Sequence, residues 1–214
     1  MKRYLSIAVA LVLLTAGGVF AQQPAQPPVR EISKIAGEVY RFRNNNHYAV
    51  FAVTPAGAIV TDPIDLGAAQ WLKDEIKRRF NQPVRYVIYS HDHADHISGG
   101  QVFTDTAIVV AHDNAKAAII AEQRPTAVPN LTFSDDMIIE LGGTLVHLSY
   151  VGKNHSDNSI VMLFPKERIL FAVDYPLFSY ERMVRDWRAE GYAEEVLERV
   201  FHRNAEAFLA SLAR

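Results

Sequence analysis

The sequence predicts one α/β domain in which strands outnumber helices. The chain has 214 residues, of which 49% are hydrophobic and 21% charged. This is enough for one sizeable core and too little for two. Short apolar runs with strand composition recur along the chain, whereas other segments show the apolar spacing of helices. Two pairs of later strands are separated by short turn signals, which is typical of hairpins.

A meander of three short strands is expected at the start of the domain, over residues 38–43, 48–54 and 58–62. The turn signal Pro55-Ala56-Gly57 joins the last two strands. A helix should follow, because apolar side chains recur on one stripe while charged side chains occupy the other faces. The members of this stripe are Ala69, Leu72, Ile76 and Phe80.

A buried strand is expected over residues 84–90, which are rich in β-branched and aromatic side chains and carry no charge after Arg85. Residues 107–111, followed by a helix over residues 113–121, repeat the order of strand, loop and helix. The remaining strands form two hairpins. The first joins residues 137–141 to 144–151 through Gly142-Gly143, and the second joins residues 159–164 to 168–174.

The first 21 residues have the composition of a secretory signal. Lys2 and Arg3 precede an uncharged apolar stretch, and Val19-Phe20-Ala21 ends in a small residue of the kind that precedes cleavage. We therefore expect a protein exported to the periplasm or secreted, with a membrane anchor as the alternative. Residues 22–30, rich in Pro and Gln, predict an extended linker, and the folded domain is expected to span residues 31–214.

Charge and cysteine content narrow the possible partners. Cleavage after Ala21 would remove two basic residues and leave 20 Lys and Arg against 24 Asp and Glu, a formal charge of −4. This balance gives no indication of nucleic-acid binding. The sequence contains no Cys, so no disulfide can form. We expect a small-molecule substrate as the partner, and no membrane association once the signal is removed.

The strongest functional signal is the segment Ser90-His91-Asp92-His93-Ala94-Asp95-His96, which directly follows the predicted buried strand. Imidazole and carboxylate groups together suit Zn²⁺ or Fe. In an extended segment His91 and His93 point to the same side, whereas the adjacent Asp95 and His96 diverge, so one loop could serve two neighbouring metals. A polar loop that happens to be rich in His is the alternative interpretation.

Three further residues are candidates for the same site. His155 lies in a loop between two predicted strands, where it could complete a three-His site or remain a surface histidine. Asp62 and Asp174 each end an apolar strand, where a buried carboxylate must be paired or coordinated. A solvated carboxylate at the strand end is the alternative for both.

On these residues the chain resembles the metallo-β-lactamase superfamily over roughly residues 38–174. The pattern His-x-His-x-Asp-His followed by Gly-Gly carries the resemblance. It implies a four-layer αββα sandwich with the metals at one edge, and an outer carboxylate, Asp62, that orients the ligand loop. The implied ligands are His91, His93 and His155 for the first metal, Asp95 and His96 for the second, and Asp174 bridging both.

The end of the chain departs from the family pattern. The family has another His after the position of Asp174, in a Gly-His-Gly-like loop, and this residue completes the second metal site. Here the only later histidine is His202, which shares a face with Glu198 and Glu206 opposite the apolar stripe of a helix predicted over residues 193–212. We expect His202 to be solvent-exposed. The sandwich is therefore expected to lack part of its C-terminal half, as a natural short form or a shortened relative of a longer enzyme.

The resemblance implies a zinc-dependent hydrolase that uses metal-activated water against an ester, thioester, lactone or phosphodiester. Asp95 or Asp174 would transfer the proton, and His47, Lys153 and Asn154 would contact the substrate. Asp at position 174, where β-lactamases carry Cys or Ser, points away from a dedicated β-lactamase. We expect one tightly bound Zn and a second, weaker one.

Two other functions remain open on the sequence. The first is a mononuclear Fe oxidoreductase, similar to the persulfide dioxygenases of the superfamily, which would use two of the site histidines with Asp174. The second is a non-catalytic binding protein that keeps a vestigial metal site. The identity of the bound metal and turnover of substrate distinguish these functions.

Overall fold

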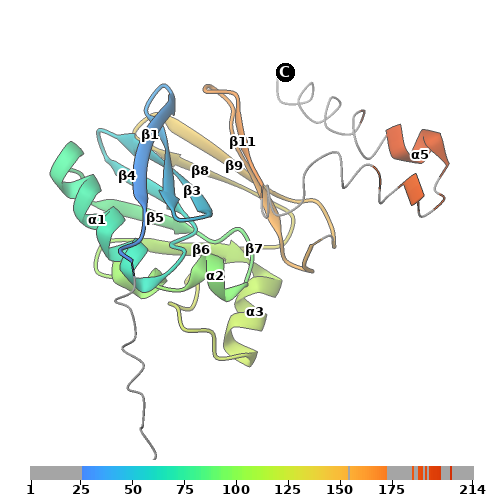
Figure 1. Ribbon diagram of the computed structural model, residues 1–214, viewed down its shortest axis with the longest axis horizontal. Helices are drawn as coiled ribbons and strands as arrows, with labels where there is room; N and C mark the ends of the chain where they lie inside the picture. The colour runs from blue at the N-terminus through green and yellow to red at the C-terminus, as the bar shows by residue number, and fades with distance from the viewer. Residues whose placement is uncertain are drawn as a thin grey trace, which may run out of the picture.

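The computed structural model describes residues 26–153 and 155–172, together with a few residues between 185 and 203. The predicted signal peptide and three candidate site residues, Asn154, Asp174 and His202, lie outside the described residues. Strands drawn in blue to green and strands drawn in yellow to orange form two separate sheets (Figure 1). In the described part of the chain, no helix is both long and apolar enough to cross a membrane.

The larger sheet has seven strands in sequence order. Its first four strands are antiparallel, and each strand from β4 onward pairs in parallel with the next. The strands are β1 (Arg30–Ala36), β2 (Val39–Asn44), β3 (His47–Thr54), β4 (Gly57–Thr61), β5 (Val84–Ile88), β6 (Ile108–His112) and β7 (Leu131–Phe133). The parallel part places the carboxyl ends of β4, β5 and β6 at the same edge of the sheet.

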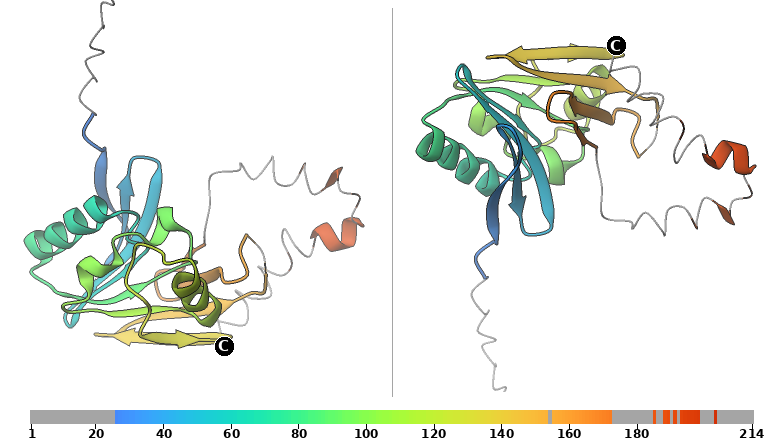
Figure 2. Two further views of the ribbon diagram at one scale, coloured as in Figure 1. Left: turned by 90° about the horizontal axis from the view of Figure 1, so that it is seen from below. Right: turned by 90° about the horizontal axis from the view of Figure 1, so that it is seen from above.

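The smaller sheet is antiparallel, and its strand order is β11-β10-β9-β8. The strands are β8 (Asp136–Leu141), β9 (Thr144–Tyr150), β10 (Ile160–Phe164) and β11 (Ile169–Phe171). Gly142 and Gly143 have φ angles of +54° and +85° and form the predicted two-residue turn between β8 and β9. Figure 2 shows this sheet to one side of the larger one.

Helix α1 (Leu66–Phe80) begins and ends with standard caps. The Asp65 carboxylate accepts a 2.7 Å hydrogen bond from the amide of Ala68, and Asn81 ends the helix in the left-handed conformation. The other described helices are α2 (Ala94–Ile97), the 3₁₀ helix η1 (Gly100–Phe103), α3 (Asp113–Ala121) and α5 (Glu194–Glu198). The predicted stripe on α1 buries Ala69, Leu72 and Ile76.

Two hydrophobic clusters lie on opposite faces of the larger sheet. On β3, Phe51 packs in the cluster formed with α1, α3 and η1, whereas Val50 and Ala52 pack in the cluster between the two sheets. This alternation is expected for a strand that is buried on both faces. Helices, larger sheet and smaller sheet therefore form successive layers, which confirms the predicted α/β sandwich class.

Four elements were not predicted from the sequence: β1, α2, η1 and β7. Strand β1 is mostly exposed or half-buried, so it has no strong apolar pattern. It begins at Arg30, the last residue of the expected linker, and the Arg30 Nε donates a 3.0 Å hydrogen bond to the side-chain oxygen of Asn44. The other three elements have three or four residues each, too few to show a period.

Glu75 on α1 gives a prediction for the pH dependence of stability. Hydrogen bonds from Arg78, together with Arg79, outweigh burial and lower the pKa of Glu75 to about 2. A lowered pKa stabilises the fold above the ordinary value near 4.5, and this contribution is lost as the pH falls toward 2. Because the side chain of Arg78 is 65% exposed, Glu75→Gln should lower the free energy of unfolding at pH 7 by only about 1 kcal/mol.

Urea unfolding of the metal-free protein at pH 7 and pH 3 measures this effect. The difference between the wild type and Glu75→Gln should shrink at pH 3, where the carboxylate of the unfolded chain is largely protonated. A difference of the same size at both pH values would contradict the assignment.

Candidate metal centre

The His-rich loop begins at the carboxyl end of β5. Tyr89, Ser90 and His91 continue from this strand and are completely buried. His93 is the residue before the first turn of α2, so this short helix carries Asp95 and His96. The loop is therefore held between the buried centre of the larger sheet and a helix packed at its edge.

Three imidazoles converge at this edge. One ring nitrogen from each of His91, His93 and His155 lies within 4.8 Å of the other two. His93 Nδ1 and His155 Nε2 lie 3.1 Å apart. Zinc–nitrogen bonds of 2.0–2.1 Å in a tetrahedral site place two ligand nitrogens about 3.4 Å apart. The donor set and its spacing therefore fit one zinc ion, to which the loop carrying His155 contributes from a different part of the chain.

A second group of donors lies beside the first. The ring of His96 is 4.4 Å from that of His91, centre to centre. The Nε2 of His96 lies 3.8 Å from Asp95 Oδ2, and the Nε2 of His47 lies 3.2 Å from the same oxygen. Partial burial acts to raise the pKa of Asp95, but His96, a backbone hydrogen bond and His47 together hold it below its usual range.

Asp62 contacts both groups of donors, the first through Ser90 and the second directly at His96. This fully buried carboxylate accepts hydrogen bonds from the Ser90 amide at 2.8 Å and the Ser90 hydroxyl at 2.5 Å, and its Oδ2 lies 3.1 Å from His96 Nδ1. Because the Ser90 proton goes to Asp62, the hydroxyl oxygen can accept from His91 Nδ1, which lies 3.0 Å away. Both histidines are then left with a lone pair on Nε2, the form required of a metal ligand.

The backbone at Asp62 is strained, with a φ angle of +25°. Non-glycine residues rarely adopt such angles, and they persist where the surrounding structure holds them. Here the next residues are fixed to the ligand loop, because the Ile64 amide donates a 2.7 Å hydrogen bond to the carbonyl of His96. The strained turn therefore places the Asp62 carboxylate under the loop.

A buried network that the sequence did not reveal connects the two ligand loops. Asp92 accepts hydrogen bonds from Asn158 at 2.9 Å and from Arg124 at 3.0 Å, and its amide donates to the Asn158 side-chain oxygen. Burial acts to raise the pKa of Asp92, but these two donors hold it below its usual range. Asn158 lies three residues after His155, so this network sets the position of the His155 loop relative to His91 and His93.

The Gly-Gly pair of the motif has a steric reason. Gly99 has a φ angle of +87°, and a Cβ there would lie 2.7 Å from the carbonyl oxygen of Asp65. A Cβ on Gly100 would lie 1.9 Å from the hydroxyl of Tyr89, which is within hydrogen-bonding distance of Thr126. Glycine is therefore required at both positions for the loop to pack closely against α1 and β5.

The structure thus brings together most of the predicted site residues that it describes: His91, His93, His155, Asp95, His96, Asp62 and His47. Lys153 is exposed, two residues before His155. The contact between His47 and Asp95 joins residues 48 positions apart, which no local pattern reveals.

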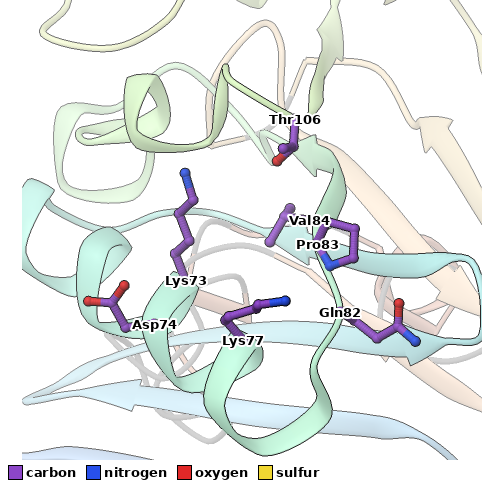
Figure 3. Close-up of a pocket in the computed structure, with 7 residues that line it drawn as sticks. All are labelled: Lys73, Asp74, Lys77, Gln82, Pro83, Val84 and Thr106. Carbon is purple, nitrogen blue, oxygen red and sulfur yellow. The ribbon is translucent and has the colours of Figure 1, made fainter.

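Two cavities lie elsewhere and are lined by none of the clustered histidines. One, of about 270 Å³, lies at the opposite end of β5, between α1 and Thr106, and Lys73 and Lys77 project from α1 along it (Figure 3). The other, of about 550 Å³, lies between the two sheets and is lined by residues such as Arg41, Tyr48 and Phe171. The candidate centre therefore lies in neither of these two cavities.

Comparison with known proteins agrees with this geometry. The chain is 27% identical over 180 residues to the metallo-beta-lactamase type 2 of Elizabethkingia meningoseptica, covering 79% of this chain and 69% of that protein. It is 25% identical over 152 residues to the alpha subunit of 2,4-dinitroanisole O-demethylase of Nocardioides sp., covering 69% of this chain but 46% of that protein.

The fold and a family model give the same result. The structure of a metallo-beta-lactamase from Pontibacter korlensis superimposes with a TM-score of 0.62 at 21% identity, covering 74% of this chain and 81% of that one. Residues 45–197 match the family model of the metallo-beta-lactamase superfamily. This range includes the His-rich loop, the Asp62 turn and the His155 loop. The chain therefore belongs to the metallo-beta-lactamase superfamily.

Proposed function

We propose that this chain is an exported zinc-dependent hydrolase that cleaves an ester, thioester, lactone or phosphodiester bond. Membership of the superfamily supports a metal-dependent hydrolase at the level of the family. The observation that carries the proposal is the convergence of His91, His93 and His155 within 4.8 Å, with Asp95 and His96 beside them. The charged, apolar and small-residue pattern of the first 21 residues supports export.

Each group at the site has a distinct task in this proposal. The three imidazoles would hold the first zinc, which when bound supplies a water-derived nucleophile at neutral pH and polarises the oxygen of the bond to be cleaved. Asp95 is 56% exposed beside this group, so its carboxylate can accept a proton and return it to the leaving group. Asp174, outside the described residues, is the second candidate for this transfer. Asp62 and Ser90 hold the imidazoles in the required orientation.

The surroundings of the site favour a substrate that carries an anionic group. Lys153 is exposed on the loop that presents His155, where its ammonium group can contact a carboxylate or phosphate next to the cleaved bond. A β-lactam is the second candidate substrate, because the Elizabethkingia relative is a metallo-beta-lactamase by name. The Asp at position 174, where such enzymes carry Cys or Ser, favours the other bond classes.

Metal analysis combined with a substrate panel tests the proposal. The purified chain should contain zinc by plasma mass spectrometry and should hydrolyse at least one ester, thioester, lactone or phosphodiester, more rapidly than a chromogenic β-lactam. One Fe per chain with oxygen consumption would instead assign an oxidoreductase. Bound zinc with no turnover of any substrate would assign a binding protein.

A further inference from the structure

His47 occupies an unexpected position next to the second group of donors. It is the first residue of β3, and its Nε2 lies 3.2 Å from Asp95 Oδ2. Its ring is 6.1 Å from that of His96, centre to centre, and nearly perpendicular to it. Its side chain is 42% exposed, and that of Asp95 is 56% exposed, so an ion can reach both from solvent.

The spacing of these donors is compatible with a shared metal ion. Asp62 lies against Nδ1 of His96, so the opposite nitrogen, Nε2, is the one that faces Asp95. Two imidazole nitrogens thus lie 3.2 and 3.8 Å from one carboxylate oxygen. Ligand atoms around a tetrahedral zinc ion lie about 3.4 Å apart. The two observed separations lie on either side of this value.

The hairpin that carries His47 is held in place independently of any metal. At its two-residue turn, Asn45 has a φ angle of +56°, and its side-chain oxygen accepts a hydrogen bond from the Val29 amide. The side-chain amide of Asn44, which pairs with His47 across the turn, donates a 2.8 Å hydrogen bond to Asp65. Asp65 directly follows Ile64, whose amide donates a hydrogen bond to the His96 carbonyl on α2. The hairpin tip and α2 are therefore both held by the segment Ile64-Asp65. The site is therefore preorganised.

We propose that His47 is a protein ligand of the second metal, together with Asp95 and His96. This inference rests on the proposed function, because it assumes that the first site holds zinc. It adds to Asp95 and His96 a protein ligand from before the His-rich motif, whereas the family pattern takes its additional histidine from after the position of Asp174. The second zinc should then bind well enough to be measured, although more weakly than the first.

Titration of the full mature chain with zinc against a competing chelator dye tests the inference. The wild type should show two resolved steps. His47→Ala should keep the first step unchanged, whereas the affinity of the second step should fall by about 10- to 100-fold or more, since a lost outer partner alone costs that much. His47→Asp, which offers a carboxylate oxygen in place of the imidazole nitrogen, should recover part of the second step. Cobalt absorption spectra report the same loss without any dependence on activity.

Matched controls separate the possible outcomes. His147→Ala on β9 and His202→Ala should leave both steps unchanged, and circular dichroism should show that His47→Ala folds normally. An unchanged second step in His47→Ala, or a wild type that binds one zinc only, would overturn the role of His47 while leaving the proposed function intact. Loss of the second step in His202→Ala alone would assign the ligand to His202. A wild type that binds no zinc would instead overturn the proposed function itself.

Discussion

His93→Ala should remove tight zinc binding and lower kcat/KM by at least about 100-fold. Loss of an outer-shell partner costs about 10- to 100-fold in affinity or activity, and loss of a direct ligand should cost at least the upper end of that range. His93 Nδ1 lies 3.1 Å from His155 Nε2, so removing this imidazole leaves a site of two ligands that come from different loops. Such a pair cannot define a tetrahedral site.

Zinc content and thermal unfolding with and without zinc check this prediction independently of the substrate. At a free zinc concentration of 100 times Kd, binding stabilises the folded wild type by about 2.7 kcal/mol, and this gain should be absent in His93→Ala. His147→Ala is the matched control, because it removes an imidazole from β9, where residue 147 pairs with Ile138 and Leu163. Full zinc content in His93→Ala would refute the assignment of the first site.

Helices and strands in which apolar side chains recur at a regular spacing could be predicted from the sequence, and those without such a spacing could not. The stripe of α1 repeats over 15 residues, so its buried face could be identified from spacing alone. The turn at Gly142-Gly143 could also be predicted, because two consecutive glycines between strands are a local signal for a hairpin turn. Strand β1 instead lies at the edge of its sheet, and its polar side chains follow no alternation, so its pairing with β2 depends on partners that a linear pattern does not contain.

The same distinction applies to the site. His91, His93, Asp95 and His96 form one local motif, which is why they could be identified without a structure. The contacts that hold this motif are long-range. The ion pair of Arg124 with Asp92 joins residues 32 positions apart, and the contact of His47 with Asp95 joins residues 48 positions apart. Arg124 follows α3 with no pattern around it, so only the packing of α3 against the sheet reveals its role.

Asp62 couples the fold to the metal centre through its contacts with Ser90 and His96, and it gives the second large prediction. Asp62→Ala should leave the amide and the hydroxyl of Ser90 buried without their acceptor. Each such group costs about 1–3 kcal/mol. We therefore expect Asp62→Ala to lower the free energy of unfolding of the metal-free protein by roughly 2–6 kcal/mol, measured by urea unfolding in the presence of a chelator.

Asp62→Asn separates the role in the metal centre from the role in folding. Its remaining oxygen can still accept from the Ser90 amide, but its amide nitrogen would face His96 Nδ1 and the Ser90 hydroxyl, which both need an acceptor. This variant should fold, yet bind zinc about 10- to 100-fold more weakly in the chelator titration, because both metal groups lose the partner that fixes their ring orientation. Asp105→Asn, an exposed carboxylate paired with Lys73, is the matched control and should leave the affinity unchanged. An unchanged zinc affinity in Asp62→Asn would show that Ser90 and the backbone alone position the ligands.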